Sequence, residues 1–459
     1  MQTESIPGPQ ARIGIHSRSM GVKLIVVGAL ALSMVIPGLF VGGLVQERSE
    51  RAAGVVREIS DYAGGEQVFL GPTLLIPYRI PPQSSTDFAR YGTYLIFPAA
   101  ASAVVRTVTE ERHRSLFKVP VYRAEIGFDA AFDLAGMPSA APDRAEFDWN
   151  RAEVAVGVSN PRGALADAAL TSGGKTVTLA PAQTASDLRI GGDQNQAVRV
   201  TLLGGTINAP IKPGARFNAA SSLRFSGAQR IAILAYGKTT HLSAQGDWPN
   251  PSFDGGFLPL HRAVTASGFT AEWSIPFIAR GIRGDGPAEW FAAISSSDLG
   301  TSFVEVADPY QSVNRSRKYA LLFIGLVFLS YFAFEVTTGR RVHPAQYLLV
   351  GLAQMIFYLL LLSLAERVGF DWAFALAGAA TVALLSINAA WVFSSRAHGV
   401  RAVAIFTLLY ASIYMLLRLE DNALLVGAVA SFFAIAAVMY FTRKIEWYGG
   451  TAVSNSNVS

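Results

Sequence analysis

The chain has 459 residues, of which 51% are apolar and 15% charged, and its mean hydropathy is positive, which is unusual for a soluble protein of this size. The net charge of +5 does not indicate nucleic-acid binding, because the basic residues stand beside apolar segments and form no basic face interleaved with aromatic side chains. Cysteine is absent, which excludes disulfides, thiolate zinc sites and a cysteine nucleophile.

The first apolar segment, residues 24–45, contains no charged residue and is long enough to cross a hydrocarbon core of about 30 Å as a helix. A cleaved signal peptide would have a shorter apolar region ending in an A-x-A-like site, and none is apparent. We therefore predict an uncleaved anchor that follows a cytoplasmic segment, residues 1–23. Pro37 and Gly38 are expected to kink this helix.

Residues 46–61 are charged, with apolar residues at roughly helical spacing. A Glu47–Arg51 pair at i,i+4 would support a helix here. We predict a juxtamembrane helix that continues the first span and links it to the following domain.

Residues 62–317 consist of short alternating or β-branched runs broken by Gly, Pro, Asn and Asp. This pattern predicts a β-rich domain of antiparallel sheets in a sandwich-like arrangement. The expected strands are 67–75, 90–97, 103–109, 115–132, 153–158, 175–179, 197–203, 216–225, 230–236, 241–245 and 268–275. Two short helices are expected near 161–169, with Asn160 as the cap, and near 287–294.

Five further apolar segments fill residues 318–442 and are joined by short connections, which predicts a bundle of five membrane helices. They are 319–336, 347–365, 372–393, 402–417 and 423–441. A tail, residues 443–459, follows. The fold class is therefore an α+β membrane protein: one N-terminal span, a large β-rich domain and a C-terminal five-helix bundle.

The loops indicate the orientation. Basic residues cluster before the first span and after the second, fourth and sixth, whereas the intervening turns 366–371 and 418–422 carry more acid than base. Six spans in an inner membrane, with both termini in the cytoplasm and residues 46–317 in the periplasm, place these clusters on the cytoplasmic side. The clusters are Arg12, Arg18 and Lys23; Arg340, Arg341 and His343; Arg396, His398 and Arg401; and Arg443 and Lys444.

No pattern for catalysis or cofactor binding stands out, so we predict no catalytic residue, cofactor or metal. The histidines lack metal-ligand spacing, and the Gly173-Gly174-Lys175-Thr176 segment lacks the first glycine of a phosphate-binding loop and is expected to be a hairpin turn. The acidic residues Asp247, Asp254, Glu272 and Asp285 could pair as general acid and base, but their spacing favours solvated loop carboxylates.

Polar residues are rare in the predicted spans. Gln354 and Asn388 are expected to form hydrogen bonds between helices. Glu335 stands at a cytoplasmic span end, where we expect it to pair with Arg340 and Arg341.

Several longer motifs carry a resemblance to a known family. Phe69-Leu70-Gly71-Pro72 precedes Ile76-Pro77, and 246–253 (GDWPNPSF) precedes 256–259 (GFLP). The segments 315–320 (RSRKYA), 343–351 (HPAQYLLVG), 357–362 (FYLLLL) and 445–448 (IEWY) follow. With these motifs the chain resembles the CreD family of bacterial inner-membrane proteins. The segment 135–235 resembles the family only in its strand-like character.

The resemblance implies a role in cell envelope integrity. It also implies expression under a two-component regulator of envelope or cell-wall stress, with effects on β-lactam and colicin tolerance. It implies no catalytic residue and no cofactor.

Two motifs have both a structural and a binding interpretation. Trp248, Pro249 and Pro251, with Phe253 and Phe257 after them, form either a docking edge for an envelope partner or, as we favour, a corner packed into the sandwich. His343 and Pro344 begin the third span beside the basic pair Arg340 and Arg341, and we favour a topological role over a signalling contact.

Three functions remain open. We favour a non-enzymatic anchored protein that binds envelope or cell-wall proteins, with the lipid bilayer as its other partner; it predicts an exposed apolar patch on the β-rich domain. A transporter or flippase for a hydrophobic envelope component predicts a cavity or lateral opening in the bundle. A periplasmic hydrolase predicts a cleft with two close carboxylates. The sequence does not indicate an oligomeric state.

Overall fold

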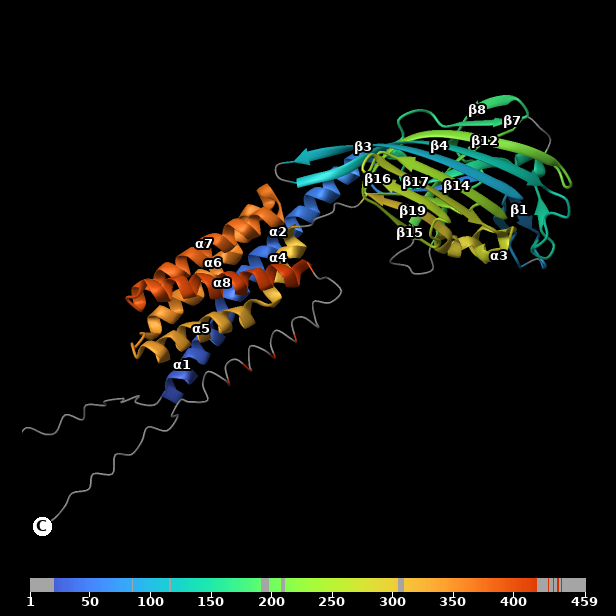
Figure 1. Cartoon of the computed structure of the whole chain (residues 1–459). Coiled ribbons are helices and arrows are strands. Elements are labelled where there is room, and N and C mark those ends of the chain that lie inside the picture. The colour runs from blue at the N-terminus through green and yellow to red at the C-terminus, as the bar shows by residue number, and fades with distance from the viewer. Residues whose placement is uncertain are drawn as a thin grey trace, which may run out of the picture. The chain divides into compact units, whose positions relative to one another are not determined.

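The computed structural model describes residues 20–418, apart from 85, 115–116, 191–197, 208–210 and 304–308, together with positions 428, 432, 436 and 439. The chain divides into two units (Figure 1). The helical unit comprises Met1–Glu50 and Ala307–Ser459, and the β domain comprises Arg51–Val306.

The first apolar segment forms α1 (Met20–Ser33) and α2 (Val35–Ala63), with a break at Met34. The break follows from Pro37, which has no N–H to donate and whose ring would meet the carbonyl of Ser33 in a regular helix. The kink expected from Pro37 is therefore confirmed. Helix α2 continues without interruption through residues 46–61.

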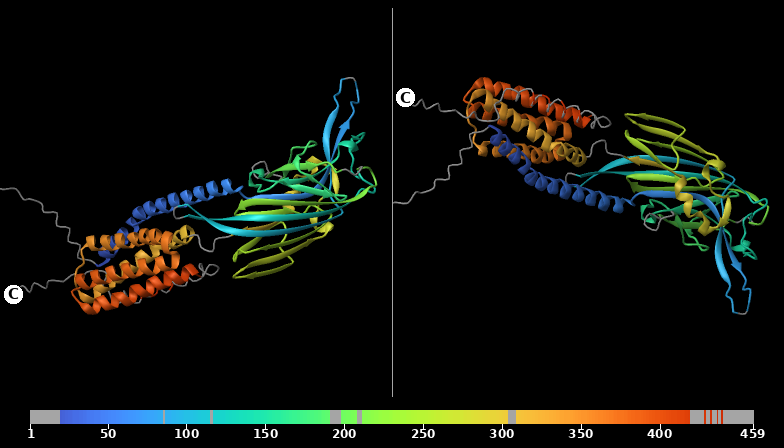
Figure 2. Two further views of the ribbon diagram at one scale, coloured as in Figure 1. Left: turned by 90° about the horizontal axis from the view of Figure 1, so that it is seen from above. Right: turned by 90° about the horizontal axis from the view of Figure 1, so that it is seen from below.

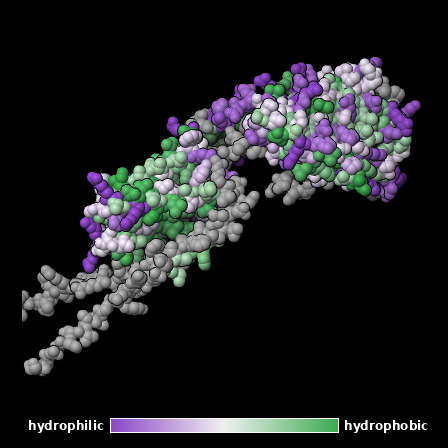
Figure 3. Space-filling model, viewed as in Figure 1, coloured by the Kyte–Doolittle hydropathy of each residue, from purple (hydrophilic) through white to green (hydrophobic). Residues whose placement is uncertain are grey.

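The other helices of the helical unit are α4 (Pro309–Lys318), α5 (Ala320–Thr338), α6 (Pro344–Val368), α7 (Phe370–Val392) and α8 (Arg396–Arg418). Five helical segments in the described part of the chain are long and apolar enough to cross a membrane: 22–63 and α5 to α8. The predicted sixth span, 423–441, lies outside the described residues except for four isolated positions. Hydrophobic residues gather on the surface of this unit, whereas hydrophilic residues cover much of the β domain (Figure 3).

The boundary between the units differs from the one expected at residue 317. The last strand ends at Phe303, and α4 packs against α6 within the helical unit. Helix α4 is polar overall, but Tyr310, Val313 and Ser316 are buried. Its polarity conceals this buried face in the sequence, which is why the sequence pattern places it with the β-rich domain.

Aromatic side chains hold the helical unit together. The ring of Tyr331 on α5 stacks on Phe406 of α8 with 6.0 Å between centroids. Phe328 and Tyr347 are also almost fully buried, and their rings are 5.6 Å apart. Helices α5 and α6 are joined in this way around one apolar core, with α8 against α5.

Two sheets make up the β domain (Figure 1). The larger, with eleven strands, has the order β10 (Asp187–Ile190), β11 (Val198–Gly205), β6 (Glu153–Val158), β1 (Gln67–Ile80), β13 (Arg230–Leu234), β19 (Asp298–Phe303), β15 (Pro251–Gly255). Beside this order, β2 (Arg90–Ile96) and β5 (Glu146–Phe147) pair with β1, β18 (Asp285–Pro287) with β2, and β9 (Ala180–Pro181) with β11.

The smaller sheet has eight strands. Their order is β16 (His261–Thr265), β17 (Gly268–Ile275), β14 (Thr239–Gly246), β3 (Ala100–Arg114), β4 (Phe117–Asp133), β12 (Arg216–Ala228), β7 (Ala169–Ser172), β8 (Lys175–Thr178). The turn between β7 and β8 is Gly173-Gly174 with φ of +58° and +75°, the backbone of a type I′ hairpin. The hairpin expected at this glycine pair is confirmed.

The sequence pattern predicts antiparallel sheets, but each of the two sheets also contains a parallel strand pair. Strand β13 runs parallel to β1, and β14 runs parallel to β3. The connections β2–β3 and β13–β14 both pass from the larger sheet to the smaller one, and they lie together, since the Lys238 N–H donates to the Pro98 carbonyl at 2.8 Å. Strands β3 and β14 therefore start at the same end, which makes them parallel.

Each of the eleven expected strands overlaps a strand of the β domain. The strands that sequence analysis missed are short or polar, such as β5, β9, β15 and β16. The two expected helices are 3₁₀ helices, Pro161–Gly163 and Ala288–Ser297, and the Asn160 side chain caps the first by accepting from the Arg162 N–H at 3.1 Å. A third, Trp149–Arg151, and the short helix α3 (Phe277–Arg280) were not expected.

Tyr236 joins the sheets through the core. Its hydroxyl donates to the carbonyls of Ser102 and Asp129, at 2.7 and 3.0 Å, and burial raises its pKa well above the ordinary value. The ring lies directly against Gly71, where a Cβ would approach it to 2.4 Å. Glycine is needed at position 71 for this close approach. The outer part of the β1–β2 hairpin projects from the domain (Figure 2), where Phe88 and Tyr91 are exposed.

Candidate functional site

Four large apolar side chains are exposed at one end of the β domain. Leu258 and Leu260 lie in the connection between β15 and β16 and are 70% and 68% exposed. Phe277 and Ile278 begin α3 and are 45% and 90% exposed. We refer to these four residues as the apolar end patch.

Backbone contacts bring the two pairs to the same end of the smaller sheet. The Leu260 N–H donates to the Glu272 carbonyl of β17 at 2.7 Å, and the Trp273 indole donates to the Phe257 carbonyl at 3.0 Å. Helix α3 begins two positions after β17 ends at Ile275. The end patch is an exposed apolar surface of the kind that a binding protein presents to a partner.

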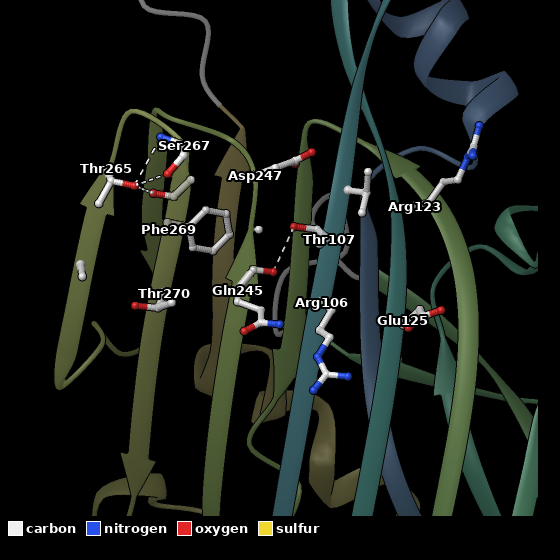
Figure 4. Close-up of a pocket in the computed structure, with 14 residues that line it drawn as sticks. Arg106, Thr107, Arg123, Glu125, Gln245, Asp247, Thr265, Ser267, Phe269 and Thr270 are labelled. Atoms are coloured by element: carbon white, nitrogen blue, oxygen red, sulfur yellow. Dashed lines mark hydrogen bonds between the residues drawn. The ribbon is translucent and has the colours of Figure 1, made fainter.

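The outer face of the smaller sheet carries a shallow cavity of about 780 Å³ (Figure 4). Residues from β3, β4, β14, β16 and β17 line it. Arg106 lies opposite Glu125 of β4 and Gln245 of β14 in the strand register. A smaller cavity of about 380 Å³ shares Arg106 and Glu125 and reaches Arg224 on β12. This face can donate and accept hydrogen bonds.

None of the described hydroxyl side chains that line the cavity in Figure 4 forms a hydrogen bond to a carboxylate or a histidine. The Asp247 carboxylate accepts from the N–H and the hydroxyl of Thr109, at 2.8 and 2.6 Å, so it fixes β14 to β3. Nor does any group of three or more His, Asp or Glu side chains in the described part of the chain lie close enough to hold a metal ion.

The other acidic candidates are also held by neighbouring groups or exposed. Asp254 and Asp298 both pair with Arg230, at 2.7 and 2.5 Å, and this guanidinium between them prevents the two carboxylates from acting as an acid–base pair. Burial lowers the pKa of Arg230, whereas the two carboxylates raise it. The net result is a raised pKa. Glu272 is exposed on β17, in register with His261 of β16.

Asp285 is buried and accepts from the Tyr94 hydroxyl at 2.7 Å and from the N–H and hydroxyl of Ser139, each at 2.5 Å. Burial, and then the hydrogen bond to Asp285, raise the pKa of Tyr94. These bonds fasten the loop after β4 to β2 and β18. They engage both oxygens of the Asp285 carboxylate.

The structure places Trp248 in the core of the β domain at 8% exposure, with its indole donating to the Asn250 carbonyl at 3.1 Å. Phe253 and Phe257 are partly buried against the same core, and the Phe253 ring contacts Trp273 at 5.8 Å. Pro249 and Pro251 are half-buried around this turn. The end patch is a separate exposed surface, because Trp248 follows the end of β14 that pairs with Phe269, whereas α3 follows Ile275 at the other end of β17.

The residues of the α5–α6 connection mainly end one helix and begin the next. His343 is the N-cap of α6, its Nδ1 accepting from the Ala345 N–H at 3.2 Å, and Pro344 occupies the first turn. Arg340 donates to the Ser394 hydroxyl at 2.6 Å, and Arg341 is exposed. Arg443 and Lys444 lie outside the described residues.

The predicted pairing of Glu335 with Arg340 and Arg341 is wrong. Its buried carboxylate forms an ion pair with Lys23 of α1 and accepts from the Val342 N–H at 3.0 Å and the Tyr347 hydroxyl at 3.1 Å. Lys23 also donates to the Val342 carbonyl at 3.0 Å. This cluster fastens the first span to α5 and α6, and sequence reasoning restricted to near neighbours missed a partner 312 positions away.

The hydrogen bonds expected between helices are present for Asn388 only. Its side chain accepts from the Tyr331 hydroxyl at 3.1 Å and donates to Gln346 at 3.4 Å. Gln354 is buried, but its amide nitrogen has no hydrogen-bond partner in the described part of the chain.

An open apolar groove of about 690 Å³ runs between α7 and α8. Small residues form its floor, among them Ala375, Gly378 and Ala379, and Trp372 and Tyr410 line it as well. An apolar groove on a membrane helix pair can accept a lipid chain or another helix.

A family model described as inner membrane protein CreD matches residues 19–448. The chain is also 30% identical over 436 residues to the inner membrane protein CreD of Escherichia coli (strain K12), an alignment that covers 92% of each chain.

Proposed function

Because the chain belongs to the CreD family of inner membrane proteins, we propose that it is a non-enzymatic, membrane-anchored binding protein that supports the integrity of the cell envelope. The apolar end patch carries this proposal. Burying four exposed apolar side chains against a partner would release about 2 kcal/mol or more each. Envelope or cell-wall proteins are the partners that fit a domain held beside the membrane.

The proposed orientation places both termini in the cytoplasm and the β domain in the periplasm. The basic loops around Arg340 and Arg396 support it. Arg315, Arg317 and Lys318 would then lie on the outer side, against the charge rule. Packing accounts for Arg317, because its guanidinium lies against Gly42 of α2, where a Cβ would approach it to 2.6 Å.

Single cysteines test the orientation, since the chain has none of its own. Gln83→Cys in the β domain should react with a membrane-impermeant maleimide in intact spheroplasts. Ala397→Cys, before α8, should react only after the membrane is opened. The reverse labelling pattern would exclude the proposed orientation.

Transport of a hydrophobic envelope component is the second candidate. The groove between α7 and α8 favours it, because it is apolar and open to the surface among the described residues of the helical unit. The binding role is preferred, because the apolar segment 24–45 has no charged side chain and the buried Glu335 of α5 is engaged in an ion pair.

A substitution series in a host that lacks its own copy tests the binding role. The test variant is Leu258→Ser/Leu260→Ser/Ile278→Ser, and the control is Phe88→Ser/Tyr91→Ser, which removes exposed rings from the projecting β1–β2 hairpin. Uptake of a hydrophobic dye and β-lactam tolerance report on the envelope barrier.

We expect the control to restore the barrier and the end-patch variant to fail, with both variants present in the membrane at equal levels. If the end-patch variant restores the barrier fully, the end patch is not the binding surface and the proposal loses its support.

A further inference from the structure

A cavity of about 790 Å³ lies between the last turns of α2 and the β3–β4 hairpin, within the β domain. Its walls include the exposed side chains of Tyr62, Val108 and Leu165, at 85%, 65% and 52% exposure. Ile59 and Val121 add further apolar surface. Half of this lining would suit the hydrocarbon part of a ligand.

The remaining lining is polar and includes three arginines. Arg112, Arg114 and Arg123 border the cavity, and Glu110 is the acidic residue among its lining side chains. Glu110 pairs with two of these arginines, with its oxygens 3.2 Å from Arg112 and 3.5 Å from Arg123, and Arg114 pairs with Glu58 of α2 at 2.5 Å. One carboxylate shared by two guanidinium groups leaves an excess of positive charge.

We propose that this cavity binds one anionic amphiphile from the membrane, a molecule with acyl chains and a phosphate headgroup of net negative charge. The guanidinium groups match a phosphate, which they can contact through two parallel hydrogen bonds. The apolar walls cover part of the chains. This amphiphile site goes beyond the proposed function and does not depend on the end patch or its protein partner.

The membrane is the source because of α2. The helix that forms one wall of the cavity with Ile59 and Tyr62 is continuous with the apolar segment from Val35 onward. An acidic peptide would satisfy the arginines, but it would leave the exposed Val108 and Leu165 without an apolar partner. A neutral lipid would leave the excess charge unmatched.

The test uses the full-length chain in nanodiscs of phosphatidylcholine. Four probes are compared by calorimetry: dihexanoylphosphatidylglycerol below its micellar concentration, dihexanoylphosphatidylcholine, inorganic phosphate and hexaglutamate. The variants are Arg112→Gln/Arg114→Gln/Arg123→Gln and Val108→Ser/Leu165→Ser. The matched control is Arg216→Gln, an exposed arginine paired with Asp133 at the opposite end of β12.

We expect dihexanoylphosphatidylglycerol to bind at least tenfold more tightly than the other three probes. The triple arginine variant and the Val108/Leu165 variant should each lose at least tenfold in affinity, and the control variant should bind as the parent does. All three variants carry surface substitutions, and their far-ultraviolet circular dichroism should match the parent.

Equal binding of the two lipids, tightest binding of hexaglutamate or phosphate, or unchanged affinity in the arginine variant would each overturn the proposal. These outcomes leave the binding function untouched, since that function is judged by the envelope barrier in end-patch variants. Conversely, failure of the end patch in cells would not alter the affinities measured in nanodiscs.

Discussion

Replacing Lys23 with methionine should destabilise the helical unit more than replacing Glu335 with glutamine. Lys23→Met removes the cation and leaves a carboxylate that is 3% exposed, with the Val342 N–H and the Tyr347 hydroxyl as its remaining donors. Glu335→Gln leaves Lys23 instead, whose side chain is 24% exposed and can turn its ammonium group toward water.

The burial of the two partners sets the magnitude. Leaving one member of a buried ion pair unpaired costs about 3–5 kcal/mol, and the partial exposure of Lys23 places Lys23→Met near the lower end, at about 3 kcal/mol. Glu335→Gln should cost about 1–2 kcal/mol, because the amide carbonyl still accepts from the Val342 N–H. The double variant should cost less than the sum of the two.

The free energy of unfolding is measured for the full-length chain by titration with a denaturing detergent, followed by circular dichroism. A double-mutant cycle then gives the coupling between the two side chains. A coupling below about 0.5 kcal/mol, or a larger loss in Glu335→Gln than in Lys23→Met, would refute the reasoning.

Two further predictions concern the β domain. Gly71→Ala should lower the free energy of unfolding by about 1–3 kcal/mol, since its methyl group would overlap the buried Tyr236 ring. The control Gly127→Ala on β4, where a Cβ meets no atom within 4 Å, should be neutral. Equal thermal unfolding temperatures for the two variants would contradict this prediction. The Ala135 N–H and then Arg216 lower the pKa of Asp133, so this carboxylate stabilises the fold above its ordinary pKa of about 3.9 and the benefit is lost as pH falls through the lowered value. The stability difference between the parent chain and Asp133→Asn should therefore be largest near neutral pH and disappear in acid, and a difference that grows in acid would show that the sign is wrong.

Much of the fold could be predicted from sequence because its signals are local. Uncharged apolar segments mark the spans, alternation marks the strands, and Pro37 accounts for the break at Met34. The parallel pairing of β14 with β3 could not be predicted, because it depends on where two distant chain crossings meet. Helix α4 was missed as part of the helical unit, since its few buried residues are outnumbered by polar ones.

The candidate site was harder to predict for the same reason. Trp248, which precedes Pro249, is buried in the core, whereas Leu258 and Ile278 are exposed, and no local pattern distinguishes them. Burial depends on the packing of two sheets, which local sequence does not reveal. The pairing of Lys23 with Glu335 likewise required the order of helices in space.

The most direct test restores the protein in three forms to a host that lacks it: the full chain, the helical unit alone, and residues 1–306, which hold the β domain on the first span. Dye uptake and β-lactam tolerance are measured for each. The account predicts that residues 1–306 restore the barrier and that the helical unit alone does not. Restoration by the full chain alone would contradict it and make transport through the helical unit the leading function.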